Sequence, residues 1–220
     1  QNPKLPKPPR KEKQKNMLIP LFELLGTIAF AISGAIIGMG RRMDIFGVCI
    51  LGITTACGGG MLRDIILGLT PPAMFLNPQY VLVATVTSIL FFLPAVRRLC
   101  GKNLRIYDTL MLITDAIGLG AFTVCGMRVA IEAGYYENLF LVVFVGVITG
   151  VGGGLLRDIF AGDRPYIFIK HIYACAAILG GLLCYLLWKP LGADIAMLSS
   201  CALVIAMRLC SAHFRWSLPH

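Results

Sequence analysis

The sequence predicts an all-α polytopic membrane protein whose seven transmembrane helices form an inverted repeat of three plus three helices and a seventh helix. Hydrophobic residues make up 57% of the chain and charged residues 14%, whereas soluble domains average about 25% charged residues. The mean hydropathy is +0.79. A motif, Gly-Gly-Gly-x-x-Arg-Asp, occurs at residues 58–64 and again at residues 152–158. Three predicted crossings separate the copies, and an odd number of crossings reverses direction, so the copies point oppositely through the bilayer.

Seven apolar runs are long enough to cross a membrane, for which a helix needs about 20 residues. Short joints rich in Arg, Lys, Pro and Gly separate the runs. The spans are predicted at residues 18–39, 45–67, 79–98, 107–128, 138–160, 171–188 and 192–212. The joints, in chain order, hold Arg41-Arg42, Thr70-Pro71-Pro72, Arg97 to Arg105, Gly134 with Glu137, Asp163-Arg164-Pro165 and Lys189-Pro190.

These spans divide the chain into five parts. Residues 1–16 are rich in Lys and Pro and predict a disordered basic tail. Residues 17–105 form the first three-helix repeat, and residues 106–190 form the second, inverted one. Residues 191–212 are the seventh transmembrane helix, and residues 213–220 are a cytoplasmic tail.

The duplication extends beyond the motif itself. A glycine and then a proline follow each copy at matching offsets, as Gly68 with Pro71 and Gly162 with Pro165. Upstream, the segment from Glu23 to Phe30 is similar to the segment from Asp115 to Phe122. Similarity on this scale indicates a true internal duplication.

Three consecutive glycines within an apolar span need a physical reason, because each costs roughly 1 kcal/mol relative to Ala in a helix. We expect them to break the helix where it faces a pathway, since backbone groups exposed to lipid must be satisfied. The alternative is close helix packing, which small residues allow. The predicted pore residues of this kind are Gly58, Gly59, Gly60, Gly152, Gly153 and Gly154.

The charged pairs that follow the glycines, Arg63-Asp64 and Arg157-Asp158, are predicted to serve the pore or its gating. Successive residues on a helix do not face each other, so an Arg is not expected to pair with its adjacent Asp. A reciprocal arrangement is our hypothesis, in which each Arg meets a carboxylate or a carbonyl of the other repeat, as Arg63 would with Asp158. The alternative is snorkelling of each Arg to the headgroups.

Glu23 and Asp115 occupy matching places early in spans one and four. Carboxylates inside a membrane are expensive, so their recurrence predicts a role. We expect them to attract a cation or to support a broken helix; hydrogen bonding between helices is the structural alternative.

The remaining composition excludes several functions. The cysteines show no Cys-x-x-Cys pair, and we expect no metal site and no cofactor. No phosphate loop or nucleophile–base pair is visible, so an enzyme is not expected. The net charge of +9 reflects a basic tail and span-flanking residues, which indicates topology and not nucleic-acid binding.

Orientation follows from basic residues near the ends of the spans. Their excess on one side places the C-terminus in the cytoplasm and the N-terminus outside, although the basic tail argues the other way. The residues on the cytoplasmic side are Arg41, Arg42, Arg97, Arg98, Lys102, Arg105, Arg208 and Arg215.

With both motifs, their Gly/Pro tails and the Glu23 and Asp115 segments, residues 17–212 resemble the prokaryotic branch of the trimeric intracellular cation channel family. The resemblance implies a seven-span protomer and a symmetric homotrimer in the prokaryotic inner membrane. It also implies a potassium-permeable pore in each protomer, lined by glycine-broken helices two and five. The animal members' Lys-Glu-Val motif is absent, so their regulation by phosphoinositide or calcium is not carried over.

We therefore expect a channel for monovalent cations whose partners are copies of itself and membrane lipids. In a channel, carbonyls freed at the Gly triplets would replace part of the hydration shell of the ion. The alternative is a secondary transporter for a small zwitterion such as glycine, in which Arg and Asp would hold a carboxylate and an amine. A non-transporting scaffold fits the intramembrane charges least well.

Overall fold

A computed structural model of the chain describes residues 18–94, 104–169 and 172–214. The predicted basic tail at 1–16 and the basic residues Arg97, Arg98, Lys102 and Arg215 lie outside the described residues. The helices are α1 (Leu18–Gly40), α2 (Ile45–Ile66), α3 (Ala73–Leu76), α4 (Gln79–Phe92), α6 (Leu104–Ala130), the π-helical turn η1 (Ile131–Tyr135), α7 (Leu139–Phe160), α8 (Tyr166–Ile169), α9 (Tyr173–Leu191) and α10 (Ala193–His213).

Six of the described helices are long and apolar enough to cross a membrane: α1, α2, α6 continuing into η1, α7, α9 and α10. The protein is therefore an all-helical, multi-pass membrane protein. The predicted third span, 79–98, corresponds to α4, which is apolar but only 14 residues long. Residues 95–98 of that span lie outside the described part, so the seventh crossing stays a prediction.

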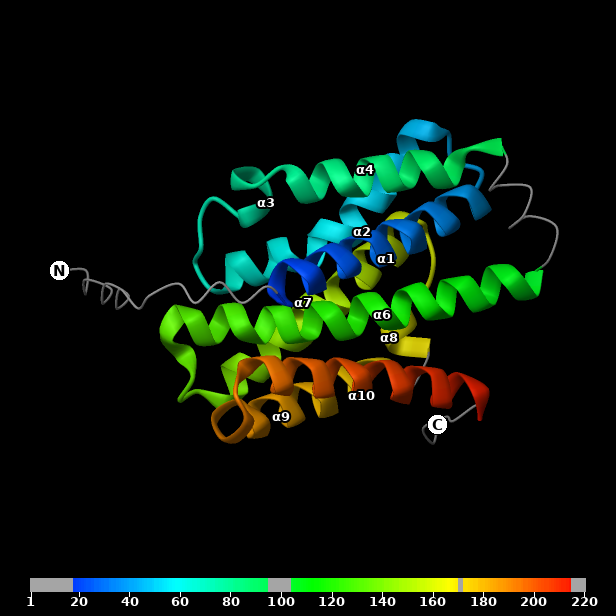
Figure 1. Ribbon diagram of the computed structural model, residues 1–220. Helices are drawn as coiled ribbons and strands as arrows, with labels where there is room; N and C mark the ends of the chain where they lie inside the picture. The colour runs from blue at the N-terminus through cyan, green and yellow to red at the C-terminus, as the bar shows by residue number, and fades with distance from the viewer. Residues whose placement is uncertain (1–17, 95–103, 170–171, 215–220) are drawn as a thin grey trace.

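The helices form two groups joined by α6 and α7. Figure 1 shows α6 between α1 on one side and α10 on the other, and α6 packs against both helices. Helices α1, α2 and α4 pack on one another, while α9 packs on α10. Because α7 contacts both α2 and α9, the crossing of α2 with α7 lies where the two groups meet.

The Gly triplets do not break their helices, so this prediction was wrong. Helix α2 runs without interruption through residues 58–60, and α7 does so through residues 152–154. The glycines instead let the two backbones approach. A Cβ on Gly59 would overlap the carbonyl oxygen of Thr149, and one on Gly153 would overlap that of Thr55. Close packing is therefore the reason for the middle glycines, and their carbonyls are not freed to coordinate an ion.

The helices end one turn later, at the single glycines that follow each motif. Gly68 and Gly162 have φ of +69° and +73°, a left-handed conformation that glycine adopts at little cost. The next amide closes each end, as Leu69 N donates to Asp64 O and Asp163 N donates to Asp158 O, both at 2.8 Å. These are the bonds of a Schellman-type helix end, and they explain why the Gly/Pro tails recur.

Candidate functional site

In both motifs the Arg pairs with the Asp next to it, contrary to our expectation. Arg63 Nε donates to Asp64 Oδ1, and Arg157 Nε donates to Asp158 Oδ1, each at 2.8 Å. The long arginine side chain folds back along its own helix and reaches the neighbouring carboxylate. Our expectation considered only the directions of the Cβ atoms, so it did not predict this contact. Within the described part of the chain, Arg63 and Asp158 form no ion pair, so the reciprocal arrangement is not found.

The second oxygen of each aspartate holds the segment that follows. Asp64 Oδ2 accepts a hydrogen bond from Ala73 N at 2.7 Å, and Asp158 Oδ2 accepts one from Tyr166 N at 2.8 Å. Ala73 and Tyr166 are the first residues of α3 and α8, where helical N–H groups lack partners. Each Asp therefore ties a short helix back onto the long helix before it.

The burial of both arginines argues against snorkelling. Arg63 is 8% exposed and Arg157 is fully buried, so other parts of the protein surround each guanidinium. Gly60 and Gly154, the third glycines of the motifs, lie beneath these groups, since a Cβ on either would stand within 4 Å of Nη2 of the corresponding Arg.

The two arginines have different surroundings, and around Arg157 the charges are joined directly. Arg157 Nη1 donates to Asp115 Oδ1 at 2.8 Å and to Ser33 Oγ at 2.5 Å. Tyr173 donates its hydroxyl proton to the same oxygen of Asp115 at 3.3 Å. Asp115 is thus the ion-pair partner of Arg157 in the second motif. A buried carboxylate needs such a cationic partner, because an unpaired buried charge is costly.

A further charge completes this cluster. Arg208 Nη2 of α10 lies 3.5 Å from Asp115 Oδ2, and its guanidinium covers the ring of Tyr173 at 4.6 Å from the centroid. The sequence analysis counted Arg208 among the basic residues on the cytoplasmic side and assigned it no partner. Its position inside the predicted span 192–212 was the available signal that it is an interior residue.

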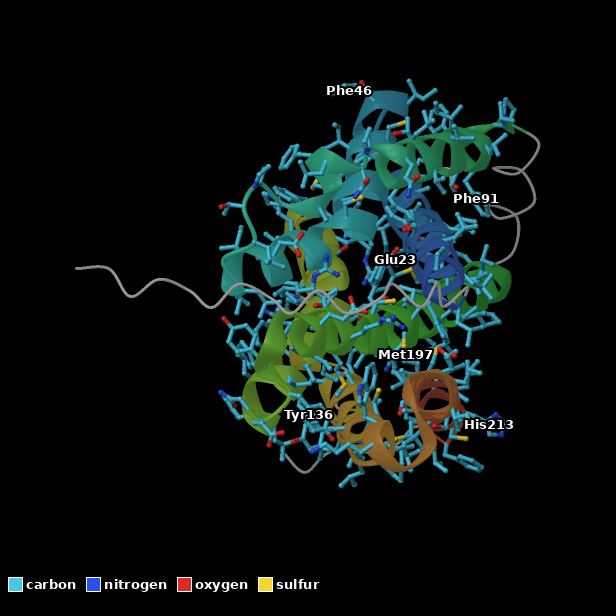
Figure 2. All side chains as sticks on the ribbon, turned by 60° about the vertical axis from the view of Figure 1, so that its left-hand side comes forward. Glu23, Phe46, Phe91, Tyr136, Met197 and His213 are labelled. Carbon is cyan, nitrogen blue, oxygen red and sulfur yellow. The ribbon has the colours of Figure 1, made fainter. Side chains whose placement is uncertain are left out.

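Around Arg63 the early carboxylate, Glu23, is not joined to the Arg63–Asp64 pair, and a cavity opens. Glu23, which Figure 2 shows toward the middle of the molecule, accepts a hydrogen bond from the Tyr80 hydroxyl at 2.5 Å. No ion pair joins Glu23 to Arg63 or to another described residue. The cavity has a volume of about 300 Å³ and is lined by Glu23, Thr27, Ala56, Cys57, Gly60, Met61, Arg63, Asp64, Ala73, Met74, Asn77, Gln79, Tyr80, Phe122 and Cys125.

Tyr80 and Tyr173 were missed by the sequence analysis, although a signal was present. Each lies seven residues after the residue whose amide bonds the motif aspartate, Ala73 or Tyr166. Each then donates to the carboxylate early in its half of the chain, Glu23 or Asp115. Aligning the two halves beyond the Gly/Pro tails would have found the pair.

The formal charges of the two sites differ. Around Arg157 the charged groups are two arginines and two aspartates, Arg208 and Asp115 included, and they cancel. Around the cavity they are Arg63, Asp64 and Glu23, which leaves one negative charge. A negative charge in a cavity bounded by apolar helices raises the local concentration of cations.

Comparison with known proteins gives a consistent result. A family model described as "Glycine transporter" matches the chain twice, at residues 20–95 and 112–189. The UPF0126 membrane protein YvgT of Bacillus subtilis is 38% identical over 91% of this chain and 95% of its own. The UPF0126 inner membrane protein YadS of Escherichia coli K12 is 35% identical over 92% of this chain and 94% of its own.

Solved structures match over nearly the whole fold. A prokaryotic TRIC channel in 0.5 M KCl has a TM-score of 0.83 at 31% identity, covering 92% of this chain and 99% of that one. A TRIC trimeric intracellular cation channel orthologue from Rhodobacter sphaeroides has a TM-score of 0.82 at 29% identity, covering 91% of this chain and 100% of that one. A TRIC channel studied for the structural basis of cation conductance has a TM-score of 0.78 at 35% identity, covering 91% of this chain and 96% of that one.

Proposed function

On the premise that this chain belongs to the TRIC family of cation channels, we propose that it forms a homotrimeric, potassium-permeable channel with a pore in each protomer. The observation that carries the proposal is the cavity beside Arg63, because it holds an uncompensated carboxylate within a bundle of apolar helices. The structural relatives are described as TRIC cation channels, which supports the same class of function. The family is one of cation channels and not of enzymes.

The cavity is our candidate for the vestibule of the pore. Glu23 of α1 and the α2 groups Gly60, Arg63 and Asp64 line it, so α2 is proposed to contribute the wall. At the crossing with α7 the backbones are in contact, and a conducting path would pass beside this crossing. We also propose pore-associated roles for the corresponding residues of the second motif, because they match the α2 residues in sequence. These residues are Gly152, Gly153, Gly154, Arg157 and Asp158.

The topology belongs to the same proposal. Seven crossings, with α4 as the third, would place the two family-matched segments in opposite directions as an inverted repeat followed by α10. We accordingly propose that the first three-helix repeat ends at residue 105, the second at residue 190 and the seventh transmembrane helix at residue 212. The protein would lie in the prokaryotic inner membrane with its N-terminus outside and its C-terminus in the cytoplasm.

The conduction proposal is tested with potassium-loaded liposomes that hold the purified protein and are diluted into low potassium. We expect rapid passive potassium efflux. Glu23→Gln should slow it on the order of tenfold, because a charge about 10 Å from the ion contributes roughly 1.7 kcal/mol at an effective dielectric constant near 20. Arg63→Gln should raise efflux, since it removes positive charge from the vestibule while Ala73 N still holds Asp64.

Glu137→Gln is the matched control, because that carboxylate is 89% exposed and borders no described cavity. Its efflux should equal that of the native protein. Absence of passive efflux together with saturable, gradient-driven glycine uptake would contradict the channel and favour a zwitterion transporter.

The trimer is tested by the mass of the purified protein in detergent. We expect a complex of three copies of the 23.9 kDa chain, measured by light scattering with the detergent contribution subtracted. A monomer or dimer in several mild detergents would contradict it.

A further inference from the structure

Four sulfur-bearing side chains line the cavity beside Arg63. Helix α2 contributes Cys57 and Met61, which are one helical turn apart and therefore share one face of the helix. Met74 of α3 and Cys125 of α6 line the same cavity, and Met74 packs on the buried cluster that includes Cys57. Two thiols and two thioethers from three helices thus share a space of about 300 Å³.

The internal duplication indicates that the repeat does not need sulfur at these positions. When the two motifs and their flanking segments are aligned, each of the four residues matches a residue without sulfur in the other half of the chain. The matched pairs are Cys57 with Val151, Met61 with Leu155, Met74 with Phe168 and Cys125 with Ser33. At these positions sulfur therefore occurs only around the cavity, which points to a role beyond packing.

The cavity also has the charge that suits a monovalent cation. Arg63 and Asp64 compensate each other through their hydrogen bond. Glu23 accepts a bond from Tyr80 and has no cationic partner among the residues that the structure describes. The Glu23 carboxylate therefore attracts a cation to the sulfur-lined wall.

The types of ligand decide which cation fits. Zinc sites are built from Cys, His and carboxylate ligands, and no three side chains of His, Cys, Asp or Glu form a metal-binding group within residues 18–94, 104–169 and 172–214. Mg²⁺ and Ca²⁺ take several oxygen ligands, whereas Glu23 is the one unpaired carboxylate that lines this cavity. Thiolate and thioether sulfur are soft ligands, and they select Cu(I).

We infer that this cavity binds a soft monovalent cation of the Cu(I) class. Cys57 supplies a thiolate ligand, Met61 and Met74 supply thioether ligands, and Cys125 adds a fourth sulfur from α6. The Cys57 thiol loses its proton to water as its sulfur forms the bond to the metal, so the charge of the cavity does not change. The three rotatable bonds of a methionine let its sulfur reach the ion. The sequence analysis expected no metal site because it considered Cys-x-x-Cys spacing, which a site with methionines from separate helices does not show.

Binding of Cu(I) does not require the channel to conduct. One consequence does rest on the proposed function: the same cavity is the candidate vestibule, so Cu(I) held by sulfur would block potassium efflux. K⁺ itself is coordinated by oxygen in channels, and the sulfur atoms would not retain it.

The test titrates Cu(I) without oxygen into the purified full-length protein in detergent, in competition with a chromogenic Cu(I) chelator. Because other cysteines can also bind Cu(I), a background protein is prepared in which four cysteines outside the cavity lining are replaced by Ser, namely Cys49, Cys100, Cys175 and Cys210. We expect the background protein to bind one Cu(I) per chain in competition with the chelator. No retained Cu(I) would overturn the inference.

Variants of the background protein locate the ion. Loss of even an outer-shell partner of a metal typically costs about 10–100-fold in affinity, so Cys57→Ser and Met74→Leu should each weaken Cu(I) binding at least about tenfold. Cys201→Ser and Met197→Leu are the matched controls, because both residues are buried and lie outside the cavity lining. The controls should bind Cu(I) as the background protein does. Unchanged binding in both cavity variants would overturn the assignment.

Two further measurements keep the inference falsifiable if a cavity variant does not fold. X-ray absorption at the copper edge of the background protein should show sulfur ligands, and a shell of nitrogen and oxygen alone would overturn the site. Liposome efflux separates this inference from the proposed function. Cu(I) binding without any passive potassium efflux would uphold the metal site and contradict the channel, while efflux without Cu(I) binding would do the reverse.

Discussion

Replacing Asp115 with alanine is expected to destabilise the protein more than any other single substitution at the charged sites. The change leaves Arg157, which is fully buried, and Arg208, which is 3% exposed, without their shared carboxylate. Removing one partner of a buried ion pair typically costs about 3–5 kcal/mol, because the remaining charge stays desolvated. Tyr173 also loses its acceptor. The free energy of unfolding, measured by denaturant titration in mixed micelles, is the quantity to compare.

Asp163→Ala is the matched control. Asp163 also pairs with an arginine, Arg41, but this ion pair lies at the surface, with the two side chains 26% and 50% exposed. Exposed pairs contribute about 0–1 kcal/mol, so the control should unfold nearly as the native protein does. If Asp115→Ala cost no more than the control, the cluster around Arg157 would not be a buried charge network.

Adding a methyl group to the middle glycine of either triplet is expected to have the second largest effect. In Gly59→Ala the Cβ overlaps the Thr149 carbonyl oxygen, and in Gly153→Ala it overlaps that of Thr55. Backbone atoms cannot rotate away as a side chain does, so the helices must separate. Overpacking costs about 1–3 kcal/mol and occasionally more, and we expect the upper part of this range.

The third glycine supplies the control within the same motif. In Gly60→Ala the new Cβ lies 3.7 Å from Arg63 Nη2, an ordinary contact. Alanine favours a helix over glycine by roughly 1 kcal/mol, so Gly60→Ala should be neutral or stabilising. Thermal unfolding of the three variants in one detergent makes the comparison. Equal destabilisation by Gly59→Ala and Gly60→Ala would show that the triplet is not a packing contact.

Hydropathy and internal repetition predicted most of the fold. Six predicted spans correspond to long apolar helices. Two of these helices end just before Gly68 and Gly162, the glycines whose recurrence with a proline the sequence analysis noted. The triplets were misinterpreted because composition alone cannot distinguish a helix break from a close crossing. What distinguishes them is the opposing backbone, and Thr149 lies 90 residues from Gly59 in the sequence.

The sequence identified the charged residues inside the spans, but it did not predict which residues they pair with. Cβ directions argued against an Arg bonding its neighbour, yet a guanidinium reaches well beyond its Cβ, as Arg63 does with Asp64. The difference between the two halves could not be predicted either. It includes Arg208, which α10, beyond the two family-matched segments, brings to Asp115. Matching positions in a duplicated sequence therefore have different electrostatic surroundings.

The most direct test of cation conduction is the reversal potential of the purified protein in a planar bilayer with a tenfold potassium chloride gradient. A tenfold concentration ratio corresponds to about 1.4 kcal/mol, which balances a membrane potential of about 60 mV for one elementary charge at 2.3 kcal/mol per 100 mV. We predict a reversal potential close to that value and of the sign for potassium. A reversal potential near zero or of the opposite sign, which indicates a nonselective or anion pathway, would contradict the proposal.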